Sequence, residues 1–300
     1  MEERKWEELN MDCLVNVLGR VGMESLLFNV PFVCKSWYKA TLNPLCWQHL
    51  DFPEISDSFE SRLVDSLGSE TFSASGLIKF AVNRSGGLAV SVVVPYYCPQ
   101  WAFHCFVEGC PALKSLTLPI KLVDYTIFIS RWISKWKNLQ MLRLGSSGYM
   151  QTILPEVSLH CENFTDLGIS SGYIDEDEAL ELVTLLPDIK YLDLRETSLG
   201  REDLVMILKG CKKLVHFDVR DNKGFECDDE ILKLASHIPT FMYEGSREED
   251  SSDDDRNKFH GFVYEIKETL DENWSEDVVT IDDLLPLPSS SSASSRCIRL

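Results

Sequence analysis

An apolar pattern repeats about every 25 residues through the middle of the chain. Each copy has an apolar anchor and two further apolar residues, three and five positions later. In one copy, Leu192 and Leu194 point to one face of a short strand, and Tyr191 and Asp193 to the other. The pattern therefore predicts one strand per repeat, with one buried and one exposed face. The anchors are Leu113, Leu139, Phe164, Ile189 and Leu214, at steps of 26, 25, 25 and 25 residues.

Helical spacing of apolar residues fills the stretches between the later strands. It predicts helices over 175–186, 201–214 and 228–237. A strand–helix unit cannot bury its apolar face alone, so neighbouring units stack into a continuous core. The L-x-x-L-x-L spacing resembles the leucine-rich repeat. That resemblance implies an α/β fold, a curved solenoid with parallel strands on the concave face and helices on the convex face. A fainter copy of the pattern spans 89–94.

A different pattern occupies the first 52 residues. Leu14, Val17, Leu18 and Val21 share one face of a predicted helix, and Asn10 is placed to cap its start. A second predicted helix covers 25–30. A helical module of about 45 residues has a small core, is marginally stable alone, and often gains stability from a partner.

This first stretch resembles the F-box, a small all-α module that binds an adaptor protein. Asn10 stands where the family has a proline, and Cys46 where it usually has a leucine. With the repeats, the layout is similar to the plant F-box/LRR family. The matching residues are Leu9, Asp12, Leu14, Val17, Leu18, Val33, Cys34, Lys35, Trp37, Pro44, Trp47 and Leu50.

These patterns divide the chain into four parts. We expect the F-box at 1–55, linking and capping helices at 56–87, the repeats at 88–243, and an acidic, Ser-rich, mostly disordered tail at 244–300. The linking helices are predicted at 57–67 and 75–84, the second ending at two glycines.

Charge and hydropathy exclude several functions. The net charge is −19, and residues 244–283 hold fifteen acidic against four basic side chains. A basic footprint for nucleic acid is absent from the sequence. No apolar run reaches the ~18 residues that cross a membrane, and the first residues lack the apolar segment of a signal peptide. We expect a cytoplasmic and/or nuclear protein with reduced cysteines and without a membrane partner.

Candidate catalytic chemistry is sparse. Cys110, Cys161 and Cys211 recur at one repeat position, which favours packing in the core over catalysis or metal binding. No Gly-rich phosphate loop and no Ser/His/Asp signature is present in the sequence. We therefore expect no cofactor, no metal and no catalytic residue; a cysteine enzyme is the remote alternative. Cys297 begins the last four residues, which we expect to remain unmodified because Arg299 departs from the prenylation pattern.

The resemblance implies a non-catalytic substrate-recognition subunit of an SCF-type (Skp–cullin–F-box) E3 ubiquitin ligase. Its partners would be a Skp-family adaptor, a cullin reached through that adaptor, and an unknown protein substrate. The alternative is a leucine-rich-repeat scaffold that is not assembled into a ligase. The implied adaptor-binding residues are Leu9, Asn10, Leu14, Val17, Leu18, Val33, Cys34 and Trp37. Among them, Leu14 and Leu18 are expected on the exposed face of the first helix. The candidate substrate-binding residues, from the exposed strand faces, are Met141, Arg143, Tyr191, Asp193, Arg195, His216, Asp218 and Arg220.

Overall fold

A computed structural model of the protein describes residues 9–53, 59, 61–62, 74–96, 98–120 and 126–248. The described residues form two compact units, one up to Leu113 and one from Lys114 onward. This division falls inside the predicted repeats, and the four predicted boundaries stay a prediction. Most of the predicted 57–67 helix, the tail beyond Glu248 and Cys297 lie outside the described residues.

The first unit begins with a module of short helices. Asn10 caps α1, because its side chain accepts a hydrogen bond of 3.0 Å from the backbone N–H of Asp12. Gly22, with φ of 82°, turns the chain into α2 two residues before the predicted start. The elements are α1 (Met11–Leu18), α2 (Met23–Phe28), η2 (Val30–Phe32), α3 (Lys35–Thr41), η3 (Pro44–Trp47) and β1 (His49–Asp51).

The module has its own small core. α1 packs against α3 and η3, and Leu14 and Leu18 are each only 1% exposed. Trp47 is buried, and its Nε1 donates a 2.7 Å hydrogen bond to the Thr41 carbonyl. The apolar body of this tryptophan therefore fills the core while its polar atom remains paired.

The rest of the first unit continues with α5 (Ala74–Ser85), β2 (Ser91–Val93) and α6 (Gln100–Gly109). The predicted helix over 75–84 is confirmed, and Gly86 and Gly87, at φ of 55° and 81°, end it. β2 is the faint first copy of the repeat pattern. It pairs in parallel with β1, so Leu50 lies opposite Val92.

The second unit contains a parallel sheet with its strands in chain order. Successive strands are in register by one repeat: Leu142 lies opposite Leu167, Leu167 opposite Leu192, and Leu192 opposite Phe217. β10 continues this column after the fifth copy of the pattern, inside the predicted repeat region 88–243. The strands are β3 (Ser115–Thr117), β4 (Met141–Leu144), β5 (Asp166–Ile169), β7 (Tyr191–Asp193), β9 (His216–Asp218) and β10 (Thr240–Met242).

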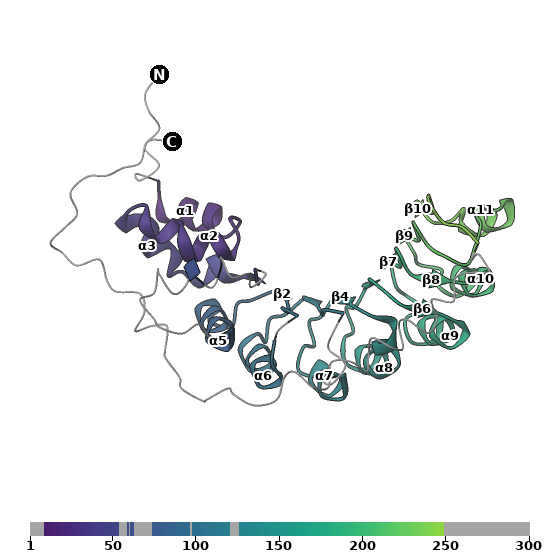
Figure 1. The fold of residues 1–300 in the computed structure, drawn as a ribbon, viewed down its shortest axis with the longest axis horizontal. Helices are drawn as coiled ribbons and strands as arrows, with labels where there is room; N and C mark the ends of the chain where they lie inside the picture. The colour runs from purple at the N-terminus through teal and green to yellow at the C-terminus, as the bar shows by residue number, and fades with distance from the viewer. Residues whose placement is uncertain are drawn as a thin grey trace, which may run out of the picture. The chain divides into compact units, whose positions relative to one another are not determined.

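Helices form the second layer of this unit. Within it, the strands line the inner side of a curve and the helices the outer side (Figure 1). The solenoid implied by the repeat pattern is thus confirmed. The helical elements are α7 (Thr126–Ile133), η5 (Ser147–Tyr149), α8 (Met150–His160), α9 (Glu176–Leu185), α10 (Arg201–Gly210) and α11 (Asp229–Ala235). No helix in the described ranges is both long and apolar enough to cross a membrane.

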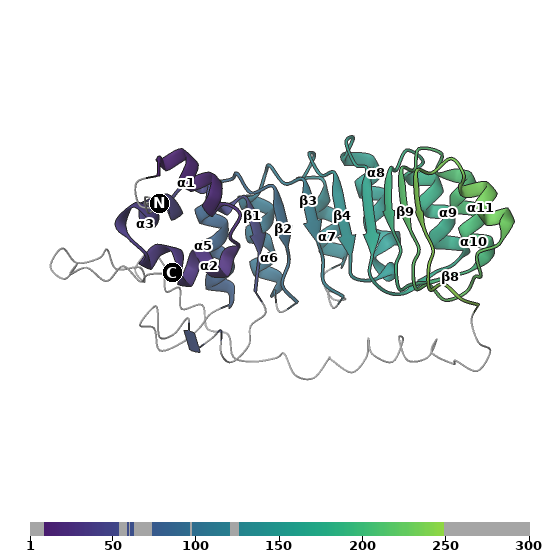
Figure 2. The same cartoon turned by 90° about the horizontal axis from the view of Figure 1, so that it is seen from above.

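The two edges of the second unit differ in their chain path. At one edge the helices begin, next to the short parallel pair β6 (Tyr173–Ile174) and β8 (Ser198–Leu199). Figure 2 labels β8 at this edge. At the other edge the helices end and the chain turns into the next strand. α10 stops at Gly210, before the predicted Leu214, because Cys211 leaves helical geometry with φ −90° and ψ 77°.

The predicted apolar repeat positions are buried. Among the anchors, Leu113, Leu139, Ile189 and Leu214 are at most 2% exposed, whereas Phe164 is half-buried. The repeated cysteines also lie inside, as their shared position predicted, and end helices α6, α8 and α10. Burial raises the pKa of Cys110 and Cys211 to about 12 and of Cys161 to about 11. These thiols are therefore protonated at neutral pH.

A buried polar pair joins two repeats. Asn222, fully buried, donates a 2.7 Å hydrogen bond from Nδ2 to the Leu194 carbonyl. Its Oδ1 accepts a 2.8 Å bond from Thr197. Sequence analysis did not identify this contact, which satisfies groups that would be costly to bury unpaired.

Candidate functional site

The first unit exposes many large apolar side chains. Seven lie in residues 11–45, and the most exposed are Phe32 at 62% and Val33 at 53%. Exposed apolar side chains concentrated in one small module are candidates for contact with a partner. We call this set the module apolar surface: Met11, Val17, Val21, Phe32, Val33, Leu42 and Leu45.

The structure divides the predicted adaptor-binding residues into two groups. Val17 and Val33 are exposed, Asn10 is exposed as the α1 cap, and Leu9, Cys34 and Trp37 are half-buried. Leu14 and Leu18 instead lie in the core, so the expectation that they share an exposed face with Val17 is wrong.

The reason for this error lies in the orientation of α1. Its buried residues are Leu14, Val15 and Leu18. At about 100° per residue, their arc is centred between Leu14 and Val15, and Val17 falls roughly a quarter turn away from that centre. The apolar residues of α1 cover more of the helix surface than the side that packs in the core. The sequence pattern alone therefore could not separate the buried apolar residues from the exposed ones.

Some candidate residues had no periodic signal. Phe32 and Leu45 lie in the short helices η2 and η3, where apolar spacing does not report a face. Trp37 has a buried Nε1 without a hydrogen-bond partner among the described residues. An unsatisfied buried donor is unusual and costly.

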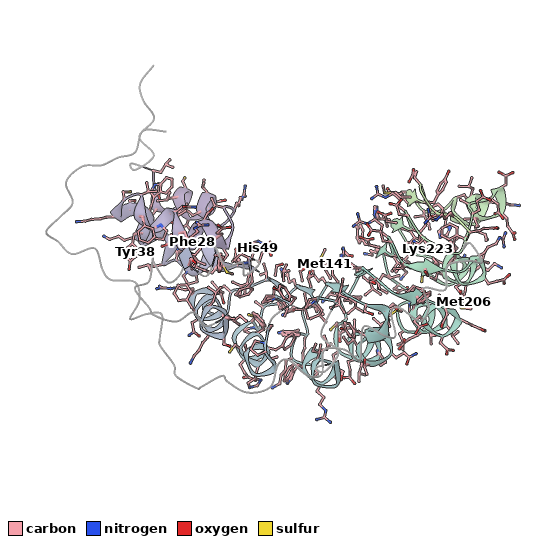
Figure 3. All side chains as sticks on the ribbon, viewed as in Figure 1. Phe28, Tyr38, His49, Met141, Met206 and Lys223 are labelled. Atoms are coloured by element: carbon pink, nitrogen blue, oxygen red, sulfur yellow. The ribbon has the colours of Figure 1, made fainter. Side chains whose placement is uncertain are left out.

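The second candidate surface is the exposed face of the strands in the second unit. Two columns of side chains cross it, because the strands are in register. Met141, Asp166, Tyr191 and His216 occupy one column, and Figure 3 shows Met141 on this strand side. Arg143, Gly168, Asp193 and Asp218 occupy the other. The strand register brings the predicted substrate-binding residues onto one face.

Two Asp-x-Arg pairs, one repeat apart, dominate this face. Arg195 donates from Nε and Nη2 to the Asp193 carboxylate at 2.9 and 2.8 Å. Arg220 donates in the same way to Asp218 at 3.0 and 2.8 Å. Each arginine also donates its backbone N–H to the same aspartate at 3.2 Å. These two-pronged, charge-assisted bonds hold both guanidinium groups in place.

Asp218 links the two pairs. The Nε of Arg195 lies 3.4 Å from its carboxylate, whose side chain is only 4% exposed. Burial alone would raise the pKa of Asp218. Hydrogen bonds from Arg220 and the positive charges of Arg220 and Arg195 lower it by more, so the pKa lies below its ordinary value. This carboxylate is therefore ionised at neutral pH and cannot act there as a proton donor.

A glycine makes room for the third arginine of the face. Arg143 Nη1 donates to Asp166 Oδ1 at 2.5 Å. A Cβ atom on Gly168 would lie 2.4 Å from Cδ of Arg143. Gly168 is therefore buried despite its outward position, because the arginine side chain lies over it.

The face is chemically suited to binding. Arg143, Arg195 and Arg220 are all paired with carboxylates, so they offer oriented polar groups without an excess of charge. Tyr191, 43% exposed, adds an aromatic side chain of the kind enriched at protein interfaces. In the described part of the chain, no three His, Cys, Asp or Glu side chains are placed to hold a metal ion.

Proteins of similar sequence are named F-box or F-box/LRR-repeat proteins. An F-box/LRR-repeat protein of Arabidopsis thaliana is 30% identical over 261 residues, which is 80% of this chain and 84% of the relative. The F-box protein FBW2 is 24% identical, over 77% of this chain and 73% of its own length. Putative F-box/LRR-repeat protein 23 is 24% identical, over 72% of this chain and 48% of its own length; both are from the same plant.

No protein-family model matches the chain. The identity to the first relative and its coverage of both chains nevertheless settle the family. This chain belongs to the F-box/LRR-repeat family.

Proposed function

We propose that this protein is a substrate-recognition subunit of an SCF-type E3 ubiquitin ligase. The observation that carries the proposal is the module apolar surface, exposed on the part of the chain whose sequence resembles the F-box. A Skp-family adaptor is the partner that this surface would bind, and a cullin would be reached through the adaptor.

The adaptor contact follows from exposure. Val17, Phe32 and Val33 are available to a partner, whereas Leu14 and Leu18 support them from the core. Burying exposed aliphatic and aromatic area provides the main driving force of association.

The strand face of the second unit would hold the protein substrate. Tyr191, Met141 and His216 supply aromatic and apolar contacts, and the paired arginines supply oriented donors. The protein itself would perform no chemistry. The mechanism would be tethering: the protein binds substrate and adaptor at the same time. This raises the effective concentration of substrate lysines near the conjugating enzyme. It would act in the cytoplasm and/or the nucleus.

Co-purification with a Skp-family adaptor tests the proposal. Val17→Glu with Val33→Glu places two charges on the module apolar surface, and a charge buried without a partner is costly. We expect adaptor binding to be lost while far-UV circular dichroism is unchanged. The matched control is Leu159→Glu, because Leu159 on α8 is 72% exposed and lies in the second unit.

Two outcomes would count against the ligase assignment. Unchanged adaptor binding by the double variant would mean that the module apolar surface is not the contact. Failure of the unaltered protein to bind any Skp-family adaptor would favour the alternative, a repeat scaffold outside the ligase, for which Asn10 in place of the family proline is the motivating feature.

A further inference from the structure

The two edges of the second unit carry opposite charge. Where the helices end, eight lysines are exposed, with Glu162 and Asp188 as the carboxylates in the same turns. Where the helices begin, acidic side chains predominate, including Glu176 and Asp177 on α9 and Asp229 on α11. We call the first side the lysine edge: Lys114, Lys135, Lys137, Lys190, Lys209, Lys212, Lys213 and Lys233.

Most of these lysines have no acidic partner. Lys213 pairs with Asp188 at 2.7 Å, but no carboxylate of the described residues lies within salt-bridge distance of the other seven. Lysines in the last turn of a helix complement its dipole, which accounts for Lys209 and Lys233. The dipole does not account for Lys114, Lys137 or Lys190, which lie beyond the helix ends.

A hollow of about 610 Å³ lies at this edge, beside the ends of α10 and α11. Lys212, Lys233 and His237 line it, together with Glu230, Leu234 and Ser236. Lys212 reaches back to the Leu208 carbonyl at 3.1 Å, so its ammonium group is held beside the hollow. Such an arrangement suits a carboxylate-rich peptide.

The chain itself supplies such a peptide. Residues 249–255 contain five carboxylates in seven positions and no basic residue. They follow Arg247 and Glu248 in the sequence. The backbone of Arg247 is fixed next to Lys223 by bonds of 3.1 Å to the Asn222 carbonyl and 2.9 Å from the Gly224 N–H. This anchor lies at the edge where the helices begin, so the acidic segment starts at the edge opposite the lysine edge.

We propose that residues 249–255 dock on the lysine edge of their own chain, at the hollow beside Lys212 and Lys233. Seven extended residues span about 23 Å, and the seven-residue helix α11 is only about 10 Å long, so the segment can cross from one edge to the other. Attraction between the carboxylates of the segment and the ammonium groups of the lysine edge favours this crossing. Docking covers the basic edge and keeps other acidic molecules from it.

Lysine acylation rates in the full-length protein test this proposal. The comparison is between the unaltered chain and Asp253→Asn, Asp254→Asn, Asp255→Asn. If the segment is docked two thirds of the time, neutralising it raises the labelling rate of Lys212 and Lys233 about threefold. Lys35 and Lys39 of the first unit serve as internal references and label equally in both proteins.

A matched variant separates docking from net charge. Asp277→Asn, Asp282→Asn, Asp283→Asn removes the same charge elsewhere and leaves the protection of Lys212 and Lys233 in place. Protection is strong at about 0.01 M salt, where the Debye length is about 30 Å, and disappears at about 1 M, where it is about 3 Å. It is also independent of protein concentration, because the contact lies within one chain.

Three results would overturn the proposal. Equal labelling of Lys212 and Lys233 in the unaltered and 253–255 variant proteins means that the segment does not dock there. Protection that survives 1 M salt means that the contact is not electrostatic. Protection that grows with protein concentration means that the occupant is a second copy of the chain.

Discussion

The helical module of the first unit and the repeats of the second bury their apolar residues by different rules. In the repeats, Leu142, Leu167, Leu192 and Phe217 occupy one position of a repeated unit, and all are buried. In the module, each helix occurs once and contacts a different neighbour. In the repeats, several copies of the sequence pattern indicate the same buried face. For a short helix that occurs once, a single stretch of sequence must indicate it. Face assignments were consequently correct in the repeats and partly wrong on α1.

The largest expected effect separates core from surface in the module. Leu14→Asp with Leu18→Asp buries two charges without partners, and we expect residues 11–52 to unfold, since a module of this size has little stability in reserve. Limited proteolysis should show rapid cleavage there. Val17→Asp, on the same helix but 46% exposed, is the control and should resist cleavage. Similar cleavage of both variants would contradict the assigned face of α1.

The corresponding comparison in the repeats concerns adjacent residues. Leu192→Ala empties a fully buried position and should lower the free energy of unfolding by ~2–5 kcal/mol. Tyr191→Ala, with a 43% exposed side chain, should change it by less than ~0.5 kcal/mol. Denaturant titration measures both, and an equal loss would mean that the strand register is wrong.

The buried amide between repeats should matter somewhat less. Asn222→Ala removes the amide donor to the Leu194 carbonyl and the amide acceptor of the Thr197 hydroxyl. The hydroxyl keeps a 2.9 Å hydrogen bond to the same carbonyl. We therefore expect a loss near the lower end of the range of about 1–3 kcal/mol that unsatisfied buried polar groups cost, which thermal denaturation can measure. Asp221→Ala is the neighbouring control, although its positive φ of 55° also adds some strain with alanine. A loss for Asn222→Ala no greater than for this control would argue that the amide is not structural.

The smallest expected effect is a dependence of stability on pH. Because the folded-state pKa of Asp218 is lowered, its ion pairs contribute fully above the unfolded-state value of about 3.9. That contribution is lost as pH falls further, through the folded-state pKa. Asp218→Asn should therefore flatten the acid side of the stability profile and leave the slope near pH 7 unchanged. If stability falls with decreasing pH in the same way in Asp218→Asn and in the unaltered protein, the ion pairs with Arg195 and Arg220 add no stability.

The same contrast explains what the sequence could and could not predict. The spacing of Leu192 and Leu194 determined which side chains face outward. The final strand, β10, lies inside the predicted repeat region, but its copy of the pattern was not singled out, although Ile238, Phe241 and Tyr243 continue the spacing. Contacts across repeats, such as Arg143 lying over Gly168, join residues 25 apart and depend on side-chain conformation as well as on register. The exposed side chains of η2 required the packed structure, because three residues have no detectable period.

The most direct test of the account compares Phe32→Ala with Leu14→Ala in the same titration against a Skp-family adaptor. Phe32 is 62% exposed and Leu14 is 1% exposed. We expect Phe32→Ala to weaken adaptor affinity by about 2 kcal/mol or more, as interface anchors do, and to change stability by less than ~0.5 kcal/mol. Leu14→Ala should instead lower stability by ~2–5 kcal/mol and leave the affinity of the folded fraction unchanged. The reverse pattern, with affinity lost through Leu14 and unaffected by Phe32, would contradict the proposal that the module apolar surface is the adaptor contact.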